Sequence, residues 1–233
     1  MINGMQFQPM PVIPRAEPFT HADWLFEIQW DGFRSLAFIE NGRCMLVSRN
    51  GREVRSFPQL NVSLPFECRA QRAVLDGEIV CLDGTGGTNF ENLLSHLGEP
   101  RFYAFDLFSC DGQDLRYLPL EERKQRLRGI VPSNGEHLLY SDHVELAGEE
   151  FFYFACERDV EGIVAKRRFD PYVLGGSTKW YKIRNPNYSR WIGREERFEK
   201  ERHSDPDWHL WTFCASACDL AAETWTNIGE SNR

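Results

Sequence analysis

Hydrophobic and polar residues alternate through the segment FEIQWDGFR near the N-terminus, which is the pattern of a β-strand buried on one side. The polar positions are Glu27, Gln29 and Asp31, and an Asp-Gly pair then predicts a turn. Arg34 follows on the return strand. We therefore predict a strand over 25–30 that brings three polar side chains and a cation to one tight turn. This arrangement suits a phosphorylated ligand, and an ordinary β-hairpin gives the same pattern.

The same patterning predicts strands and helices along most of the chain. Further strands are predicted at 33–39, 43–48, 73–82, 102–108, 137–140, 161–168 and 179–185. Helical periodicity is found at 90–97, 118–131 and 148–159. Because the strands form hairpins and the helices do not alternate regularly with them, we expect an α+β fold built on antiparallel sheets.

Changes in composition divide the chain into three parts. Residues 1–20 form a proline-containing extended arm, 21–190 the main domain, and 191–233 an appendage. The appendage pattern predicts a charged helix, a strand at 208–213 and a short helix. A zinc site there is an alternative, although its spacing matches no common structural site. Its candidate ligands are His203, His209, Cys214 and Cys218.

The composition is that of a packed globular protein, with 42% hydrophobic and 13% aromatic residues in 233. Seven scattered cysteines, an odd number, indicate reduced thiols and hence a cytoplasmic protein. The proline-rich start resembles neither a signal peptide nor a membrane anchor. The glycine-rich segment 83–88 predicts a flexible connection; a phosphate-cradling loop is the alternative, although P-loop spacing is not matched.

The formal net charge of −8 argues against binding nucleic acid over the whole surface. A local basic groove remains compatible with it. The segment 165–190 contains one acid and seven basic residues, and is either a contact surface for phosphates or a solvated basic face. The basic residues are Lys166, Arg167, Arg168, Lys179, Lys182, Arg184 and Arg190.

A series of short motifs follows in a fixed order over roughly residues 20–190. They read Gln29-Trp30-Asp31-Gly32-Phe33-Arg34, Ser48-Arg49-Asn50-Gly51, Leu75-Asp76-Gly77-Glu78, Phe102-Tyr103-Ala104-Phe105-Asp106-Leu107, Glu161-Gly162-Ile163-Val164-Ala165-Lys166 and Trp180-Tyr181-Lys182-Ile183-Arg184. The ordered set resembles the ATP-dependent DNA ligases, in particular the bacterial ligase domains used in repair. The same superfamily holds RNA ligases and mRNA-capping guanylyltransferases. The resemblance implies the ATP-grasp-like nucleotidyltransferase architecture of a ligase adenylation domain. No segment resembles the OB-fold domain that usually follows it.

The resemblance also implies how ATP and Mg²⁺ are bound. Glu27 would accept a hydrogen bond from the adenine amino group, and Phe105 would stack on the purine unless it is simply a core aromatic. Glu78 and Glu161 would hold ribose or the metal, because Mg²⁺ prefers carboxylate ligands. Lys166 would neutralise charge on the α-phosphate during in-line transfer. Arg34 would bind the ribose, Arg49 would contact phosphate or the nick, and Lys182 would contact the α-phosphate. The remaining implied nucleotide contacts are Asp31, Gly32 and Arg184, which stands where a second lysine is usual in the family. A surface ion-pair network is the alternative for Glu161, Lys166 and Lys182.

Gln29 stands where the family has the lysine that attacks ATP and becomes lysyl-AMP. An amide nitrogen is neither basic nor nucleophilic, so we expect nucleotide binding without self-adenylation. Two functions follow: a ligase-type nucleotidyltransferase acting on nicked or broken DNA in repair and recombination, or a non-catalytic module that binds nucleotide or nucleic-acid ends. An RNA ligase-like activity is a weaker alternative. A partner protein that supplies an OB-fold domain is compatible with either.

Overall fold

The computed structural model describes residues 9–84, 86–172 and 180–191. The chain divides into two units, Met1–Tyr188 and Ser189–Arg233. The second unit is described only at the 3₁₀ turn Ser189–Trp191. The elements and zinc ligands predicted beyond that turn therefore lie outside the described residues.

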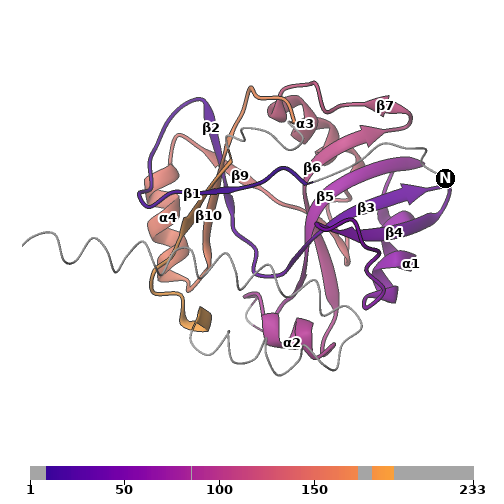
Figure 1. The fold of residues 1–233 in the computed structure, drawn as a ribbon, viewed down its shortest axis with the longest axis horizontal. Coiled ribbons are helices and arrows are strands. Elements are labelled where there is room, and N and C mark those ends of the chain that lie inside the picture. The colour runs from indigo at the N-terminus through magenta and orange to yellow at the C-terminus, as the bar shows by residue number, and fades with distance from the viewer. Residues whose placement is uncertain (1–8, 85, 173–179, 192–233) are drawn as a thin grey trace, which may run out of the picture. The chain divides into compact units, whose positions relative to one another are not determined.

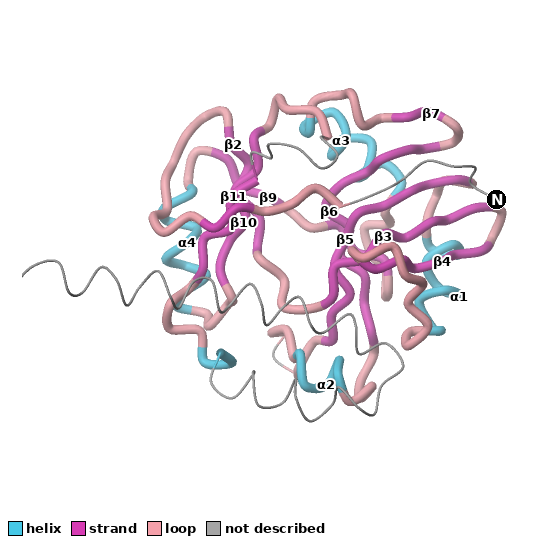
Figure 2. Tube along the Cα trace, viewed as in Figure 1, coloured by secondary structure: helices cyan, strands magenta, loops and turns pink. Residues whose placement is uncertain are grey.

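Two sheets form the described part of the first unit (Figures 1 and 2). The five-stranded sheet has the order β1 (Ile13–Pro14), β11 (Trp180–Arg184), β10 (Gly162–Arg167), β2 (Trp24–Ile28) and β9 (His143–Glu145). The six-stranded sheet contains β4 (Arg43–Ser48), β3 (Phe33–Glu40), β5 (Arg72–Cys81), β6 (Pro100–Cys110) and β7 (Gln113–Asp114), with β8 (Leu138–Tyr140) beside β6. Only β1 with β11 and β6 with β8 pair in parallel among the described strands. The predicted α+β fold with antiparallel sheets is confirmed.

Four α-helices cover these sheets in the described residues: α1 (Pro58–Glu67), α2 (Phe90–Leu94), α3 (Leu120–Ile130) and α4 (Gly148–Glu157). Helix α4 packs on the five-stranded sheet, where Phe152 and Ala155 meet Phe26 and Ile163. Helix α1 packs against β4 of the other sheet. The sequence pattern did not predict α1, because Pro65 lies inside the helix and the apolar residues form no clear stripe.

A shared hydrophobic cluster joins the two sheets and contains residues from both. Leu25 and Trp180 come from the five-stranded sheet, whereas Leu36 and Phe105 come from the six-stranded sheet. Met10, in the described part of the N-terminal segment, is buried in the same cluster.

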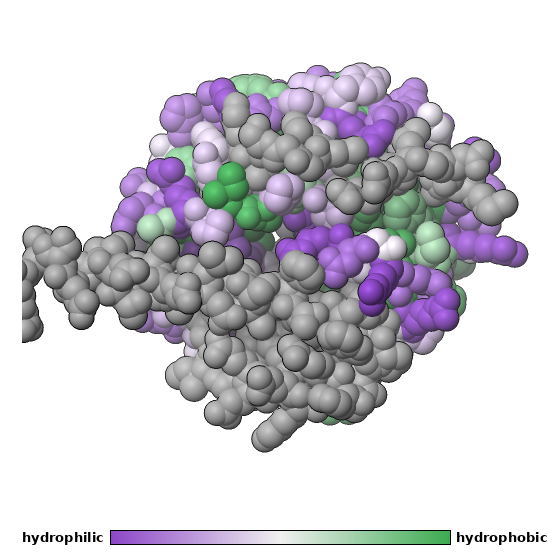
Figure 3. All heavy atoms as spheres, viewed as in Figure 1, coloured by the Kyte–Doolittle hydropathy of each residue, from purple (hydrophilic) through white to green (hydrophobic). Residues whose placement is uncertain are grey.

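The strands predicted between residues 25 and 185 are present with ends that differ by two residues or fewer. A tight turn joins β3 to β4, with Asn41 and Gly42 at φ 49° and 76°. The short strands β1, β7 and β9 were not predicted from the sequence. In the part of the chain that the structure describes, no helix has both the length and the apolar character needed to cross a membrane. Hydrophilic side chains predominate among the described residues visible in Figure 3.

Candidate functional site

Three neighbouring strands bring Glu27, Lys166 and Lys182 to one face of the five-stranded sheet. Val164 of β10 lies opposite Glu27 of β2 and also opposite Lys182 of β11. Because side chains alternate along a strand, Lys166 shares the face of Val164, while Ile163 faces α4. The register therefore brings together charged residues from motifs that are far apart in the sequence.

Gln29 lies directly after β2 and is only 6% exposed. Its backbone N–H donates to the carbonyl of Gly162, 3.0 Å away. Its side-chain atoms Nε2 and Oε1 have no hydrogen-bond partner among the described residues. Leaving a buried amide unpaired costs about 1–3 kcal/mol, so this side chain is held in place at the expense of stability.

The turn after Gln29 is fixed by packing. Asp31 is buried and accepts a hydrogen bond of 2.7 Å from the hydroxyl of Tyr188. A Cβ atom added to Gly32 would lie 2.1 Å from the backbone oxygen of Ile79. Only glycine fits this close approach of β5, so the Asp-Gly pair has a structural reason as well as its place in the motif.

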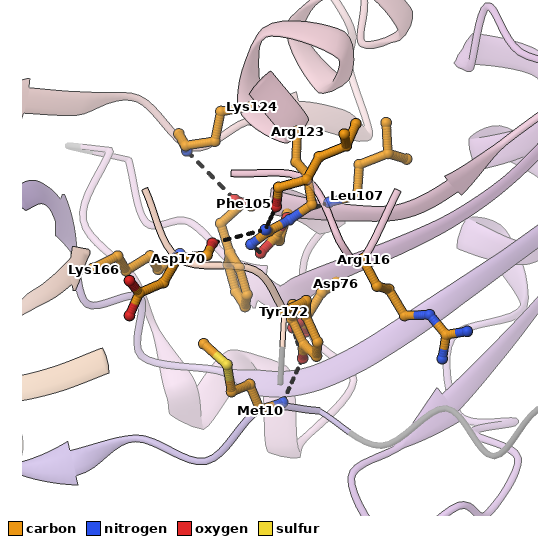
Figure 4. Close-up of polar contacts among 12 residues, drawn as sticks. Met10, Asp76, Phe105, Leu107, Arg116, Arg123, Lys124, Lys166, Asp170 and Tyr172 are labelled. Atoms are coloured by element: carbon orange, nitrogen blue, oxygen red, sulfur yellow. Dashed lines mark hydrogen bonds and ion pairs between the residues drawn. The ribbon is translucent and has the colours of Figure 1, made fainter. Parts of the chain in front are cut away.

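Arg34 is held in a buried ion pair. It donates to Asp76 through Nε at 3.1 Å and through Nη2 at 2.7 Å, and Nη1 donates to the carbonyl of Met10 at 2.7 Å. The hydroxyl of Tyr172 donates to the same Asp76 carboxylate and accepts from the backbone N–H of Met10 (Figure 4). Asp76 raises the pKa of Arg34 despite burial, which acts in the opposite direction. The N-terminal segment thus holds Arg34 in place.

Two lysines share the carboxylate of Glu27, which is 1% exposed. Lys124 Nζ donates to Oε1 at 2.8 Å, and Lys166 Nζ donates to Oε2 at 2.9 Å. Burial would raise the pKa of Glu27, but the two positive charges outweigh it and lower the pKa. Burial, with the positive charge of Lys124, lowers the pKa of Lys166 to about 8 although Glu27 opposes this. Glu27 is therefore ionised, and Lys124 is its more firmly charged partner.

Lys124 and its neighbour Arg123 were missed as site residues from the sequence. Both lie on α3, where Leu120 and Leu127 are also buried. Arg123 makes two hydrogen bonds of 2.8 Å to Asp106 of β6, and neither residue is exposed. The four residues occupy positions i, i+3, i+4 and i+7 of the helix, which is the core-facing stripe. Two cations in such a stripe are the signal that could have identified them.

Glu161 and Lys182 form a second charged pair, with Nζ 3.0 Å from Oε1. Glu78 of β5 is close enough to feel both charges. Burial raises the pKa of Glu78 to about 8; the positive charge of Arg34 opposes this rise, and the negative charge of Glu161 adds to it. Within the described residues there is no cluster of three or more His, Cys, Asp or Glu side chains that could by itself hold a metal.

The raised pKa of Glu78 predicts how stability depends on pH. Between pH 4.5 and about 8 the folded chain holds a proton on Glu78 that the unfolded chain has lost. The free energy of unfolding should therefore fall as pH rises through this window.

Glu78→Gln should remove this loss of stability. At pH 9 we expect the free energy of unfolding of the variant to exceed that of the parent chain by about 1–2 kcal/mol. Urea unfolding at pH 5.5 and pH 9 measures it. The exposed Glu53→Gln variant is the control, and parallel pH dependence of Glu78→Gln and the parent would contradict the assignment.

The remaining predicted site residues are not all at this face. Phe105 lies in the core cluster with 9% of its surface exposed, and the Lys166 ammonium lies 4.1 Å from its ring centroid. Arg49 is exposed on the turn after β4, and Arg184 ends β11.

Several bases of the segment 165–190 are paired with acids in this structure. Arg168 pairs with Glu121 and Glu145 at 2.8 and 2.9 Å, and Arg167 lies 3.8 Å from Asp170. With the pairs of Lys166 and Lys182 already described, four bases of the segment have acidic partners. Lys179 lies outside the described residues.

Sequence comparison relates this chain to a protein family and to named proteins. A family model described as the ATP dependent DNA ligase domain matches residues 8–184. The multifunctional non-homologous end joining protein LigD of Pseudomonas aeruginosa is 32% identical over 169 residues, which are 70% of this chain and 20% of that protein. The SPbeta prophage-derived DNA ligase-like protein LigB of Bacillus subtilis is 28% identical over 194 residues, 79% of this chain and 70% of LigB.

Structural comparison gives the same relationship. The structure of mycobacterial DNA ligase D complexed with ATP and MES superimposes with a TM-score of 0.67 and 30% identity, covering 76% of this chain and 60% of that one. The Chlorella virus DNA ligase-adenylate, at 16% identity and a TM-score of 0.55, shares the fold over 76% of this chain and 69% of its own. The matched residues of this chain cover about a fifth of the length of the LigD relatives, 20% of one and 22% of another.

Proposed function

Because the chain belongs to the family of ATP-dependent DNA ligase domains, we propose that it binds ATP beside Glu27, Gln29 and Lys166 but does not become adenylated at Gln29. The buried, unpartnered amide of Gln29 carries this proposal. Its Nε2 can donate to a phosphate oxygen, yet its lone pair is delocalised into the carbonyl and cannot attack phosphorus. Binding is thus separated from the first chemical step of the family.

The charges around Gln29 support a nucleotide as the ligand. Glu27 is held ionised by Lys124 and Lys166, so one of its oxygens can accept a hydrogen bond from the adenine amino group. Lys166 and Lys182 lie on the same sheet face and supply positive charge for the α-phosphate. A nucleotide would give the amide of Gln29 the partner that it lacks among the described residues.

The acidic residues fit a Mg²⁺ ion that arrives with the nucleotide. Glu78 and Glu161 are near enough for the charge of one to raise the pKa of the other. Two carboxylates with phosphate oxygens are a common environment for Mg²⁺, which would neutralise charge on the phosphates when bound. In this proposal Glu78 and Glu161 would hold Mg²⁺ as carboxylates.

The relatives indicate the setting of this activity. LigD is named for non-homologous end joining, and we place this chain with nicked or broken DNA ends in repair and recombination. Since Gln29 supplies no nucleophile, the role of the chain at these ends is to bind ATP or an already adenylated end. Gln29 favours this binding function over complete ligation.

Gln29→Met tests the proposal, since methionine has a similar length and no polar atoms to satisfy. We expect the variant to be more stable by about 1–2 kcal/mol in urea unfolding, because two unpaired polar atoms are removed. We also expect it to bind ATP with Mg²⁺ about tenfold more weakly than the parent in titration calorimetry. GTP is the control ligand, because guanine has a carbonyl group at the ring position where adenine has the amino group that would donate to Glu27. Absence of ATP binding by the parent chain, or equal binding by the variant, would contradict the proposal.

A further inference from the structure

The two lysines on Glu27 differ in how many acceptors hold them. Besides Glu27, Lys124 donates to the carbonyl oxygen of Ser141 at 3.0 Å, so two of its N–H groups have close partners. It also donates to the carbonyl oxygen of Phe105 at 3.4 Å (Figure 4), which gives the third N–H group a partner. Lys166 donates only to Glu27 within the described residues. Its ammonium otherwise faces two aromatic rings, 4.1 Å from the centroid of Phe105 and 4.3 Å from that of Trp180. Lys124 is therefore fixed, whereas Lys166 has one hydrogen bond to give up.

The position of Lys166 conflicts with adenine bound as proposed. A purine stacked on Phe105 would form a layer about 3.5–4.0 Å from the ring. The Lys166 ammonium, 4.1 Å from the ring centroid, overlaps that layer. The adenine amino group would also bind Glu27, where Lys166 donates to Oε2 and Lys124 donates to Oε1. Each oxygen can accept a second hydrogen bond, so the conflict with Lys166 is over the space that its ammonium fills. The other cation near Phe105 is Arg34, at 5.4 Å, and its bonds to Asp76 and Met10 hold it in place. Of the groups around the ring, Lys166 is the one that can leave.

We infer that Lys166 fills the adenine position itself and makes binding of the base depend on a phosphate that draws its ammonium away from Glu27. The inference rests on the proposed function. When the Lys166 ammonium leaves Glu27, a nucleoside phosphate offers it a new anionic acceptor. A nucleoside without phosphate offers none, so the ammonium would remain buried and unpaired. Lys124 stays on Glu27 in both cases and keeps the carboxylate ionised. Lys166 is thus a specificity-determining residue that selects nucleotides against nucleosides.

Lys166→Ala provides the direct test, with adenosine and ATP titrated separately by calorimetry. Removing the ammonium opens both Phe105 and Glu27 to the base, so adenosine should bind about tenfold more tightly than to the parent chain. ATP should bind more weakly, because a phosphate contact is lost. The contrast variant is Lys182→Ala, which removes a lysine that touches neither Phe105 nor Glu27. It should weaken ATP binding and not tighten adenosine. Unchanged or weaker adenosine binding by Lys166→Ala, or equal tightening by Lys182→Ala, would overturn the inference.

The parent chain gives a second test that does not depend on the folding of any variant. Inorganic tripolyphosphate, added at saturating concentration, should draw Lys166 from Glu27 and tighten adenosine binding about tenfold. Tripolyphosphate that leaves adenosine binding unchanged or weakens it, in a chain that binds ATP, would overturn this inference and leave the proposed function standing. If the parent chain binds no ATP, the proposed function fails and the inference fails with it.

Discussion

Asp106→Ala is expected to lower the free energy of unfolding by about 3–5 kcal/mol, because it leaves the guanidinium of Arg123 buried without its carboxylate. Both side chains are fully buried and joined by two hydrogen bonds of 2.8 Å. The same carboxylate also accepts from the backbone N–H of Leu107 at 2.8 Å. Urea unfolding followed by circular dichroism measures the change.

Two further variants show whether charge burial is the cause of that loss. The double variant Asp106→Leu with Arg123→Met replaces both charges by apolar groups and should recover most of the stability. Asp114→Ala breaks a partly exposed pair with Arg116, with Nη2 and Oδ2 2.6 Å apart, and should cost less than about 1 kcal/mol. If Asp106→Ala costs no more than Asp114→Ala, the buried pair does not hold α3 on β6 as described.

Gln29→Lys is expected to gain self-adenylation that the parent chain lacks. The new amine would lie at a position that is only 6% exposed in the parent chain, and burial lowers the pKa of a lysine toward neutrality. A neutral amine at this position has the lone pair needed to attack the α-phosphate. Incubation with α-labelled ATP and Mg²⁺, followed by a denaturing gel, should show label on the variant alone.

The matched control for that gain is Gln29→Met, which has a similar side-chain length without an amine. It should remain unlabelled under the same conditions. A Gln29→Lys chain that binds ATP and also remains unlabelled would show that residue 29 is not the sole reason for the lost step. Label on both variants would point to a nucleophile elsewhere in the chain.

The fold was largely predictable because alternation of polar and apolar residues is a local signal. It located β2, β3 and β5 to within two residues, and the ordered motifs gave the ligase family that the family match confirms. The pattern did not show that both faces of β2 are buried. Glu27 occupies a polar position of the alternation, which a single strand would place toward solvent. The structure places it against Lys124 of α3, 97 residues along the chain.

The candidate site was predictable only where a motif contained its residues. The positions of Glu27, Lys166 and Lys182 on one sheet face follow from the strand register, and their roles with ATP, like that of Gln29, stay predictions. Two ion pairs could be found only in the tertiary structure, because each joins residues from separate elements. They are the pair of Arg34 with Asp76 and the pair of Lys124 with Glu27. A buried carboxylate shared by two lysines has no signature in either local sequence.

The mass of the intact parent chain after incubation with ATP and Mg²⁺ tests the central claim most directly, when measured on a sample that calorimetry has shown to bind ATP. Gln29→Lys, treated in parallel, is the positive control. We predict that the parent chain binds ATP and keeps its own mass, while the variant gains the mass of one adenylate. A parent chain that gains a stable adenylate would contradict the account, and mapping the modified residue would identify the nucleophile that replaces the missing lysine.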